Sequence, residues 1–235
     1  MPKKSRINDL HSYAVSLLRG GRGFFARDLV DEQPAVPVEL YEYERCPFCR
    51  KVRETLCELD MEYISHPCAR GSGNRPHLMG LGGKQQVPFF VDPNTGTQMY
   101  ESEDIIDYLH ETYGKGRTKL ARATWPLNTA GSALATAVRN RGCRVTGRPR
   151  HHQPAETLIL YSFEISPYCR KVREALNELD LDVHIKNVAK NSPRRAELIE
   201  RGGTMMVPYL IDPNTGVEMY ESDDIVEYLC ATYGA

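Results

Sequence analysis

Apolar and polar residues alternate over Val38–Tyr43, and this period of two predicts a β-strand. The period then changes, because Val52, Leu56 and Leu59 recur at the spacing of one helical face. A helix is therefore expected from about residue 47 to Asp60. The same two patterns recur later in the chain, as a strand at Leu158–Phe163 and a helical stripe at Val172, Leu176 and Leu179.

Three further kinds of element are predicted after each strand–helix pair. A short strand is expected at Glu62–His66 and again at Asp182–Lys186, and a short helix at Pro76–Leu81 and Arg194–Glu200. The stretches VPFFVDPNTGTQMY and VPYLIDPNTGVEMY each predict a hairpin that turns at Asp-Pro-Asn-Thr-Gly. A last helix is expected from Ser102 and from Ser222, with the serine as N-cap and acidic residues in the first turn.

The two halves are copies of one domain. Aligned at an offset of 120 residues without a gap, Cys46–Gly114 and Ser166–Gly234 are identical at 35 of 69 positions, too many for chance patterning. A repeated unit of this length is a duplicated domain rather than a solenoid repeat. The expected divisions are an N-terminal extension (1–36), a first copy (37–114), a linker (115–156) and a second copy (157–235). Short helices are expected upstream of the copies, at Asn8–Arg19 and Asn128–Arg139.

The order strand–helix–strand–helix–hairpin–helix is that of the thioredoxin fold. The predicted fold class is therefore α/β, with two tandem thioredoxin-like domains, each a four-stranded mixed sheet flanked by helices. Such a duplication could pack on itself as an intramolecular pseudo-dimer, so a monomer is expected.

Composition excludes several other classes. The net charge is −1, no run of 18 apolar residues occurs, and the basic N-terminus is not followed by an apolar stretch, so neither a membrane span nor a secretory signal is expected. Seven cysteines, an odd number, favour a reducing cytoplasmic location over a disulfide framework. The linker stretch RNRGCRVTGRPRHHQP is basic but has no aromatic residue for base stacking, so a solvated linker is favoured over a nucleic-acid contact.

The chemistry of the first copy is concentrated in ERCPFCRKVRE, between its first strand and helix. A cysteine at a helix N-terminus is stabilised as thiolate by unpaired N–H groups and by the helix dipole. Positive charge nearby is added by Arg50, Lys51 and Arg53. Cys46 is therefore the expected nucleophile, and Cys49, one turn later, the resolving thiol. A structural zinc half-site and an inert buried pair are the alternatives. No second cysteine pair has a spacing suitable for zinc, and no metal is expected.

Two further motifs accompany this one in both copies. QVPFF, repeated as MVPYL, suggests a cis bond between Val87 and Pro88 that presents the Val87 backbone to an extended peptide. YESEDIIDYL, repeated as YESDDIVEYL, places Ser102 at a helix N-terminus that favours a carboxylate, with Glu101 positioned to meet an amino group.

Taken together and in this order, the three motifs resemble the glutaredoxin family and the N-terminal domain of glutathione S-transferases. The nearest resemblance is to tandem proteins of the latter kind, and it covers nearly the whole chain except the first residues and the linker. The resemblance implies glutathione as cosubstrate. It places the tripeptide thiol beside Cys46, within a set formed by Arg50, Val87, Pro88, Glu101 and Ser102. The matching set in the second copy is Ser166, Cys169, Val207, Pro208, Glu221 and Ser222.

The second copy departs from the first at the leading sulfur, because Ser166 replaces Cys46. A serine cannot form a mixed disulfide, so this copy is expected to be redox-inactive and to support the first copy or bind glutathione. The predicted function is a glutathione-dependent oxidoreductase acting on disulfides or glutathionylated proteins. A glutathione-binding scaffold and a glutathione transferase or isomerase are the alternatives. A shared iron–sulfur cluster is disfavoured, since Pro47 and Pro167 stand where cluster-binding glutaredoxins have a small residue.

Overall fold

The structure, a computed structural model, describes residues 23–116, 132, 141–146 and 149–234. The elements of the first copy are β1 (Val38–Glu42), α2 (Pro47–Glu58), β2 (Tyr63–Pro67), α3 (Asn74–Gly82), β3 (Phe89–Asp92), β4 (Thr97–Met99) and α4 (Ser102–Thr112). Those of the second are β5 (Leu158–Ser162), α7 (Pro167–Glu178), β6 (Val183–Asn187), α8 (Arg194–Gly202), β7 (Tyr209–Asp212), β8 (Val217–Met219) and α9 (Ser222–Tyr233).

The predicted order of elements is confirmed in both copies, with ends that differ by a few residues. Asn8–Arg19 and Asn128–Arg139, the two predicted upstream helices, lie outside the described residues except for Ser132. No helix in the described ranges combines the length and the apolar character that a bilayer crossing requires.

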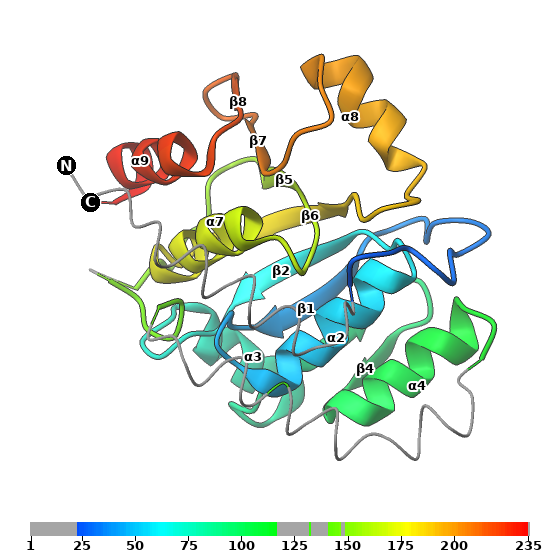
Figure 1. The fold of residues 1–235 in the computed structure, drawn as a ribbon. Helices are drawn as coiled ribbons and strands as arrows, with labels where there is room; N and C mark the ends of the chain where they lie inside the picture. The colour runs from blue at the N-terminus through cyan, green and yellow to red at the C-terminus, as the bar shows by residue number, and fades with distance from the viewer. Residues whose placement is uncertain (1–22, 117–131, 133–140, 147–148, 235) are drawn as a thin grey trace.

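The two half-sheets join into one sheet of eight strands in the order β4-β3-β1-β2-β6-β5-β7-β8 (Figure 1). The join is the antiparallel pair β2–β6, in which Ile64 lies opposite His184 and Tyr63 opposite Ile185. Ile64 and His184 are themselves equivalent residues of the two copies, 120 positions apart. The sheet therefore has a pseudo-two-fold axis at this pair, and the copies meet through the same surface, as the subunits of an isologous dimer do.

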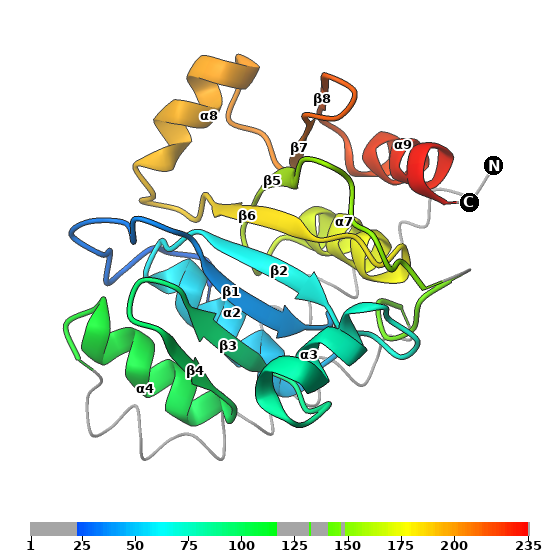
Figure 2. The same ribbon diagram turned by 180° about the vertical axis from the view of Figure 1, so that it is seen from behind.

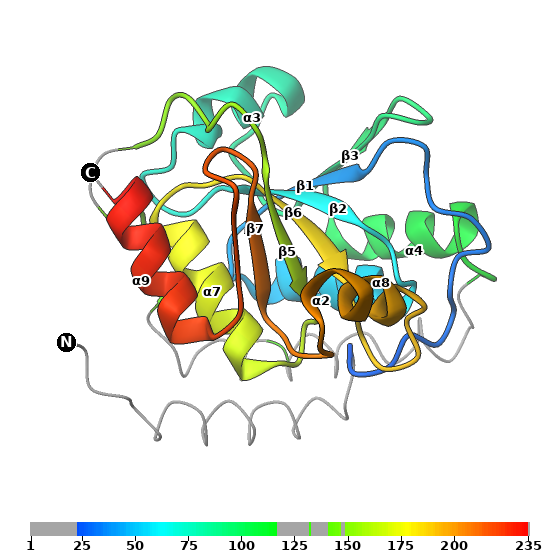
Figure 3. The same ribbon diagram turned by 90° about the horizontal axis from the view of Figure 1, so that it is seen from above.

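Helices cover both faces of the sheet, as the views from behind and from above show for the first copy (Figures 2 and 3). One continuous core lies under α2, α4, α7 and α9, and includes Leu56, Ile105, Leu176 and Ile225. Smaller clusters under α3 and α8 lie on the opposite face, around Leu78 and Leu198. Helices on both faces agree with the burial of β1 and β5, in each of which four of the five residues are buried.

The repeated Asp-Pro-Asn-Thr-Gly turn has a structural explanation. Asp92 is fully buried, and its carboxylate accepts hydrogen bonds from the backbone N–H of Asn94 at 2.9 Å and from the hydroxyls of Tyr108 and Tyr113 at 2.7 and 2.5 Å. Asp212 makes the same set of contacts in the second copy. The residues shared by the two turns therefore hold each hairpin against the last helix of its copy. Their repetition has a structural reason and implies no chemistry.

Candidate active site

Cys46 stands where β1 turns into α2. Its backbone is extended (φ −74°, ψ 119°), it is the N-cap of the helix, and Pro47 is the first helical residue. Proline suits that position because it has no N–H to leave unpaired and its φ is already helical. The sulfur of Cys46 accepts the backbone N–H of Cys49 at 3.3 Å, and both thiols are reduced. Cys46 therefore lies at the helix N-terminus, as the sequence predicted.

The two thiols differ in acidity. A hydrogen bond from the Cys49 thiol lowers the pKa of Cys46, the backbone N–H groups of Cys49 and Phe48 and the charge of Arg53 act in the same direction, and burial opposes them. Burial raises the pKa of Cys49 well above its usual range, and the bond to Cys46 adds to this. The thiolate is the attacking species. This difference in pKa therefore suits Cys46 as the nucleophile and Cys49 as the resolving thiol.

Access to Cys46 is limited, since the residue is only 3% exposed. Its neighbour Phe48 is 46% exposed and leaves an aromatic face at the surface, with the Lys51 ammonium 5.6 Å from the ring centre. On the other side, the hydroxyl of Ser132, in the linker, donates to the carbonyl of Pro47 at 2.7 Å. Ser132 is fully buried, so the linker contacts the CPFC corner directly.

The other two motifs lie together, and an ion pair joins them to α2. The Val87–Pro88 and Val207–Pro208 bonds are both cis, as suggested for the first. Gln86, just before that bond, donates to the Glu101 carboxylate at 2.7 Å, which ties the Val-Pro loop to the start of α4. Lys51 then ties α2 to α4 through an ion pair with Glu103 at 2.6 Å.

The start of α4 differs from the prediction by one residue. Glu101, not Ser102, is the N-cap, and its side chain makes no capping hydrogen bond. Its φ of 64° is in the left-handed region, which a non-glycine residue seldom adopts and which is often found at functional sites. Ser102 is the first helical residue and is buried. The second copy repeats this geometry at Glu221, with a φ of 67°.

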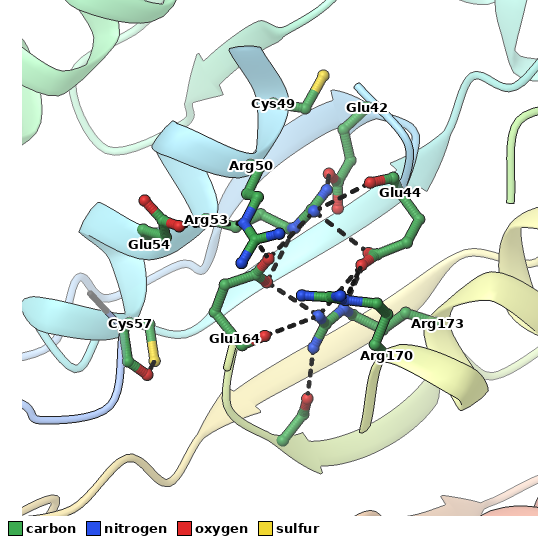
Figure 4. Close-up of polar contacts among 12 residues, drawn as sticks. Glu42, Glu44, Cys49, Arg50, Arg53, Glu54, Cys57, Glu164, Arg170 and Arg173 are labelled. Carbon is green, nitrogen blue, oxygen red and sulfur yellow. Dashed lines mark hydrogen bonds and ion pairs between the residues drawn. The ribbon is translucent and has the colours of Figure 1, made fainter. Parts of the chain in front are cut away.

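Arg50 lies in a different environment from the predicted one. Its side chain is only 2% exposed and turns into the interface between the copies, where it donates to Glu54 at 3.1 Å and lies 3.9 Å from Glu164 (Figure 4). Burial of the guanidinium between two carboxylates leaves it unsuited to reach a ligand at the Cys46 corner. Arg50 therefore belongs to the interface and not to the candidate site.

Arg53 is the centre of that interface on the first copy. Its guanidinium, 1% exposed, contacts Glu164 of the second copy through Nε–Oε2 at 3.0 Å and Nη2–Oε1 at 3.2 Å. The mirror pair is Arg173 with Glu44, at 3.0 and 3.3 Å. These pairs hold the pKa of Glu164 down at about 2, with the two arginines outweighing burial. Arg53, one of the charges predicted to act on the thiol, therefore also joins the two copies.

One residue breaks the symmetry of this interface. Arg53 also pairs with Glu42 at the end of β1, whereas Arg173 donates to the hydroxyl of Ser162 at the equivalent position at 3.0 Å. Glu42 is 1% exposed, and burial raises its pKa despite the pairing with Arg53. The copy that has the cysteine pair thus also has an extra buried carboxylate beneath it.

The second corner keeps the shape of the first without its sulfur. Ser166 is the N-cap of α7, and its hydroxyl oxygen accepts the backbone N–H of Cys169 at 3.3 Å, as the sulfur of Cys46 does for Cys49. Ser166 and Cys169 are both buried. Val207, Pro208, Glu221 and Ser222 occupy the positions that correspond to the first site, but Met206 replaces Gln86 and cannot donate to Glu221.

A basic cavity beside Cys46 was not anticipated from the sequence. It has a volume of about 220 Å³ and is lined by Tyr43, Arg45, Arg70, Arg75 and Cys143. Tyr43 and Arg45 belong to the same turn as Cys46, and the Cys46 N–H donates to the carbonyl of Tyr43 at 3.0 Å. The signal that could have found it is the contrast between ERC and EIS in the two motifs, which removes an arginine together with the sulfur.

Comparison with protein families gives a match in both halves. The family described as glutathione S-transferase, N-terminal domain, matches residues 40–118 and 160–235. The two matched segments of the chain contain the CPFC and SPYC corners, the two Val-Pro loops and the two Glu-Ser helix starts. A comparison with curated protein sequences finds no match.

Two solved structures resemble parts of the chain. Glutaredoxin 2 from Salmonella typhimurium, in complex with glutathione, is 22% identical over 41% of this chain and 45% of its own, with a TM-score of 0.29. The trimeric glutathione transferase TDR1 from Leishmania is 16% identical over 83% of this chain and 68% of its own, with a TM-score of 0.30. The chain thus matches less than half of the glutaredoxin, and family membership rests on the domain match.

Proposed function

Because the chain belongs to the family of glutathione S-transferase N-terminal domains, with one copy in each half, we propose that it is a glutathione-dependent thiol–disulfide oxidoreductase with Cys46 as its nucleophile. The observation that supports this best is the position of the Cys46 sulfur at the N-cap of α2, where it accepts the N–H of Cys49 at 3.3 Å. The same contacts lower the pKa of Cys46, which increases the thiolate fraction at neutral pH.

The reaction takes place at one sulfur. The Cys46 thiolate attacks the glutathione sulfur of a mixed disulfide, so the Cys46–glutathione bond forms and the substrate leaves as a thiolate that takes a proton from water. The thiolate of a second glutathione then attacks this intermediate, releases glutathione disulfide and restores the Cys46 thiolate. One substrate disulfide is reduced, and two glutathione moieties leave as their disulfide.

Cys49 provides a second route. When the substrate rather than glutathione is attached to Cys46, the Cys49 thiol loses its proton and attacks the Cys46 sulfur, which releases the substrate thiol and leaves a Cys46–Cys49 disulfide. Two glutathione molecules then reduce that disulfide. The raised pKa of Cys49 makes this route the slower one, because little thiolate is present before the attack.

The first corner also provides groups that suit glutathione. In the family, the Val-Pro loop meets the extended backbone of the tripeptide, so Val87 and Pro88 are proposed to do so here. The N-terminus of α4 at Ser102 suits the α-carboxylate of the γ-glutamyl end, and the Glu101 carboxylate suits its amino group. Gln86 holds that carboxylate in place through their 2.7 Å hydrogen bond.

The second copy is proposed to support the first without turnover. Ser166 has the geometry of Cys46 but no thiol, while its domain supplies Glu164 and Arg173 to the shared interface. Glutathione binding by this copy is tested separately, at the set Val207, Pro208, Glu221 and Ser222. The experiment titrates glutathione into the Cys46→Ser variant and into Cys46→Ser/Glu221→Ala.

The test is glutathione-dependent reduction of a small disulfide, coupled to glutathione reductase. Wild type is expected to turn over, Cys46→Ser to lose activity by at least a hundredfold, and Cys49→Ser to retain at least a tenth of it. Ser166→Ala is the matched control and is expected to leave turnover within twofold of wild type. Activity that persists in Cys46→Ser would contradict the proposal.

A further inference from the structure

The basic cavity beside Cys46 has positive groups that are free to bind a ligand. The guanidinium of Arg70 makes no hydrogen bond or ion pair with any described residue, and Arg45 has only a 4.0 Å contact from Nη1 to the sulfur of Cys143. Arg75 uses Nε and Nη2 to bond the carbonyls of Ala69 and Cys68, at 3.0 and 2.8 Å. These bonds fix the Arg75 side chain and leave Nη1 available.

The charge around the cavity is one-sided. Of the five described residues that line it, three are arginines and none is acidic. A guanidinium presents several donors in a plane and pairs well with a carboxylate or phosphate. A concave site walled by cations of this kind attracts an anionic ligand and raises its local concentration.

The cavity is close to the nucleophile in the chain, and the charges of the two sulfurs act on one of its lining residues. Tyr43 and Arg45 lie on the turn that ends at Cys46. Burial raises the pKa of Tyr43 to about 12, and the charges of Cys46 and Cys49 act in the same direction, so the phenol lies within the field of both sulfurs. A group bound in the cavity therefore lies against the turn that carries Cys46.

The second copy has lost this cavity lining together with its sulfur. Phe163 and Ile165 stand at the positions of Tyr43 and Arg45, and Lys190 at that of Arg70. Phe24 takes the place of Cys143, because Lys190 N–H bonds its carbonyl at 2.9 Å as Arg70 N–H bonds that of Cys143 at 3.0 Å.

Aromatic rings fill the equivalent place in the second copy. The rings of Phe24 and Phe163 lie edge to face at 6.2 Å, and the Lys190 ammonium lies over the ring of Phe25 at 5.4 Å. Arg195, the counterpart of Arg75, keeps the same kind of backbone bonds, to the carbonyls of Val188 and Ala189. The fold thus retains this arginine for structure in both copies, whereas Tyr43, Arg45 and Cys143 are particular to the copy with two cysteines.

From these observations we infer that the cavity formed by Tyr43, Arg45, Arg70, Arg75 and Cys143 binds an anionic group, a carboxylate, on the disulfide substrate of Cys46. This inference rests on the proposed function and specifies its substrate class: disulfides of acidic thiols, or of peptides with an acidic residue next to the cysteine. During the attack by Cys46, the bound part is the one that leaves as the thiolate, and the arginines also stabilise its developing charge.

The kinetic test compares two small disulfides that differ in charge, the neutral bis(2-hydroxyethyl) disulfide and the dianion 3,3′-dithiodipropionate. Arg45→Ile, which introduces the residue of the second copy, is expected to lower the ratio of kcat/KM for the dianion to that for the neutral disulfide at least tenfold. Arg75→Ala is expected to do the same. Arg195→Ala, which loses the same kind of backbone bonds away from the cavity, is expected to leave the ratio within twofold.

A binding test separates this inference from the proposed function. In the redox-inactive Cys46→Ser variant, calorimetry with 3,3′-dithiodipropionate is expected to show binding that added salt weakens and that Cys46→Ser/Arg45→Ile lacks. That result supports the cavity even if wild type turns over no disulfide. An unchanged ratio in both arginine variants, or equal binding with and without Arg45, overturns the inference. A raised KM for glutathione at an unchanged ratio also overturns it, because the cavity then binds glutathione itself.

Discussion

Arg53 and Glu164 meet across the join of the two copies through two parallel N–H to oxygen contacts, at 3.0 and 3.2 Å, with both side chains at least 97% buried. Removing one partner of a buried ion pair leaves an uncompensated charge and costs about 3–5 kcal/mol. The free energy of unfolding of a whole domain is about 5–15 kcal/mol, so the loss of one partner removes a large part of the stability.

The first prediction follows from that contact. Glu164→Gln is expected to lower the free energy of unfolding by about 3–5 kcal/mol in chemical denaturation, and Glu44→Gln, its mirror, by a similar amount. Arg141→Met is the control, since Arg141 is 49% exposed in its pair with Glu178 and such pairs contribute about 1 kcal/mol or less. Equal losses in Glu164→Gln and Arg141→Met would contradict the assigned role.

The second prediction concerns the two thiols. With iodoacetamide and peptide mapping by mass spectrometry, Cys46 is expected to be alkylated with a midpoint pH below that of an ordinary thiol, because its pKa is lowered. Cys49 is expected to react only at much higher pH. Comparable profiles for the two peptides would show that the proposed order of nucleophile and resolving thiol is wrong.

The third prediction is a pH dependence of stability from Asp60. Burial outweighs the attraction of Arg194 and raises the pKa of Asp60 to about 6, from an ordinary value of 3.8. The folded state then favours the protonated carboxyl, so this group's contribution is fully present below pH 4 and is lost as the pH rises to about 6. The loss is on the order of 2–3 kcal/mol.

Asp60→Asn isolates that contribution. The difference in unfolding free energy between wild type and variant is expected to shift against wild type from pH 4 to pH 7, and to stay level above that. Other groups titrate equally in both proteins and cancel in the difference. A difference that does not change with pH would exclude the raised pKa.

The fourth prediction restores the missing sulfur. The hydroxyl oxygen of Ser166 already lies 3.3 Å from the N–H of Cys169, the distance found for Cys46 and Cys49. In a Cys46→Ser background, Ser166→Cys is therefore expected to form a disulfide with Cys169 in an oxidising glutathione buffer, detected by mass spectrometry. The same background with Cys169→Ala is the control. If the double variant stays reduced under conditions that oxidise wild type, the two corners differ in more than the sulfur.

The sequence was sufficient for most of the fold and for the first corner. The change from period two to helical spacing at Cys46 and the repeat at an offset of 120 are local patterns, and they predicted the element order that the structure has. The geometry of the Val87–Pro88 and Glu101–Ser102 motifs depends on a few adjacent residues, so the sequence predicts it well. The difference is the N-cap of α4, which lies one residue earlier than predicted.

Long-range relationships could not be predicted in the same way. Arg50 looked like a free charge near the thiol because helical spacing does not say that a second copy covers that face. The buried partner, Glu164, is 111 residues from Arg53 in the chain. Arg70 and Cys143 likewise meet only because the linker forms an isolated β-bridge, Arg144 with Arg70, beside the loop after β2. The sequence signal for that cavity comes from aligning the two copies, which places Ile165 at the position of Arg45.

The pairing of Ile64 with its own counterpart His184 has a consequence for how the two corners came to differ. Two identical chains that met through this strand would have to carry the same residue at both corners, since each gene change appears twice in a symmetric assembly. A covalent link removes that constraint and also keeps the halves together at any dilution, because their meeting is intramolecular. The two halves are thereby free to differ, as they do at Cys46 and Ser166, while both keep the surface through which they meet.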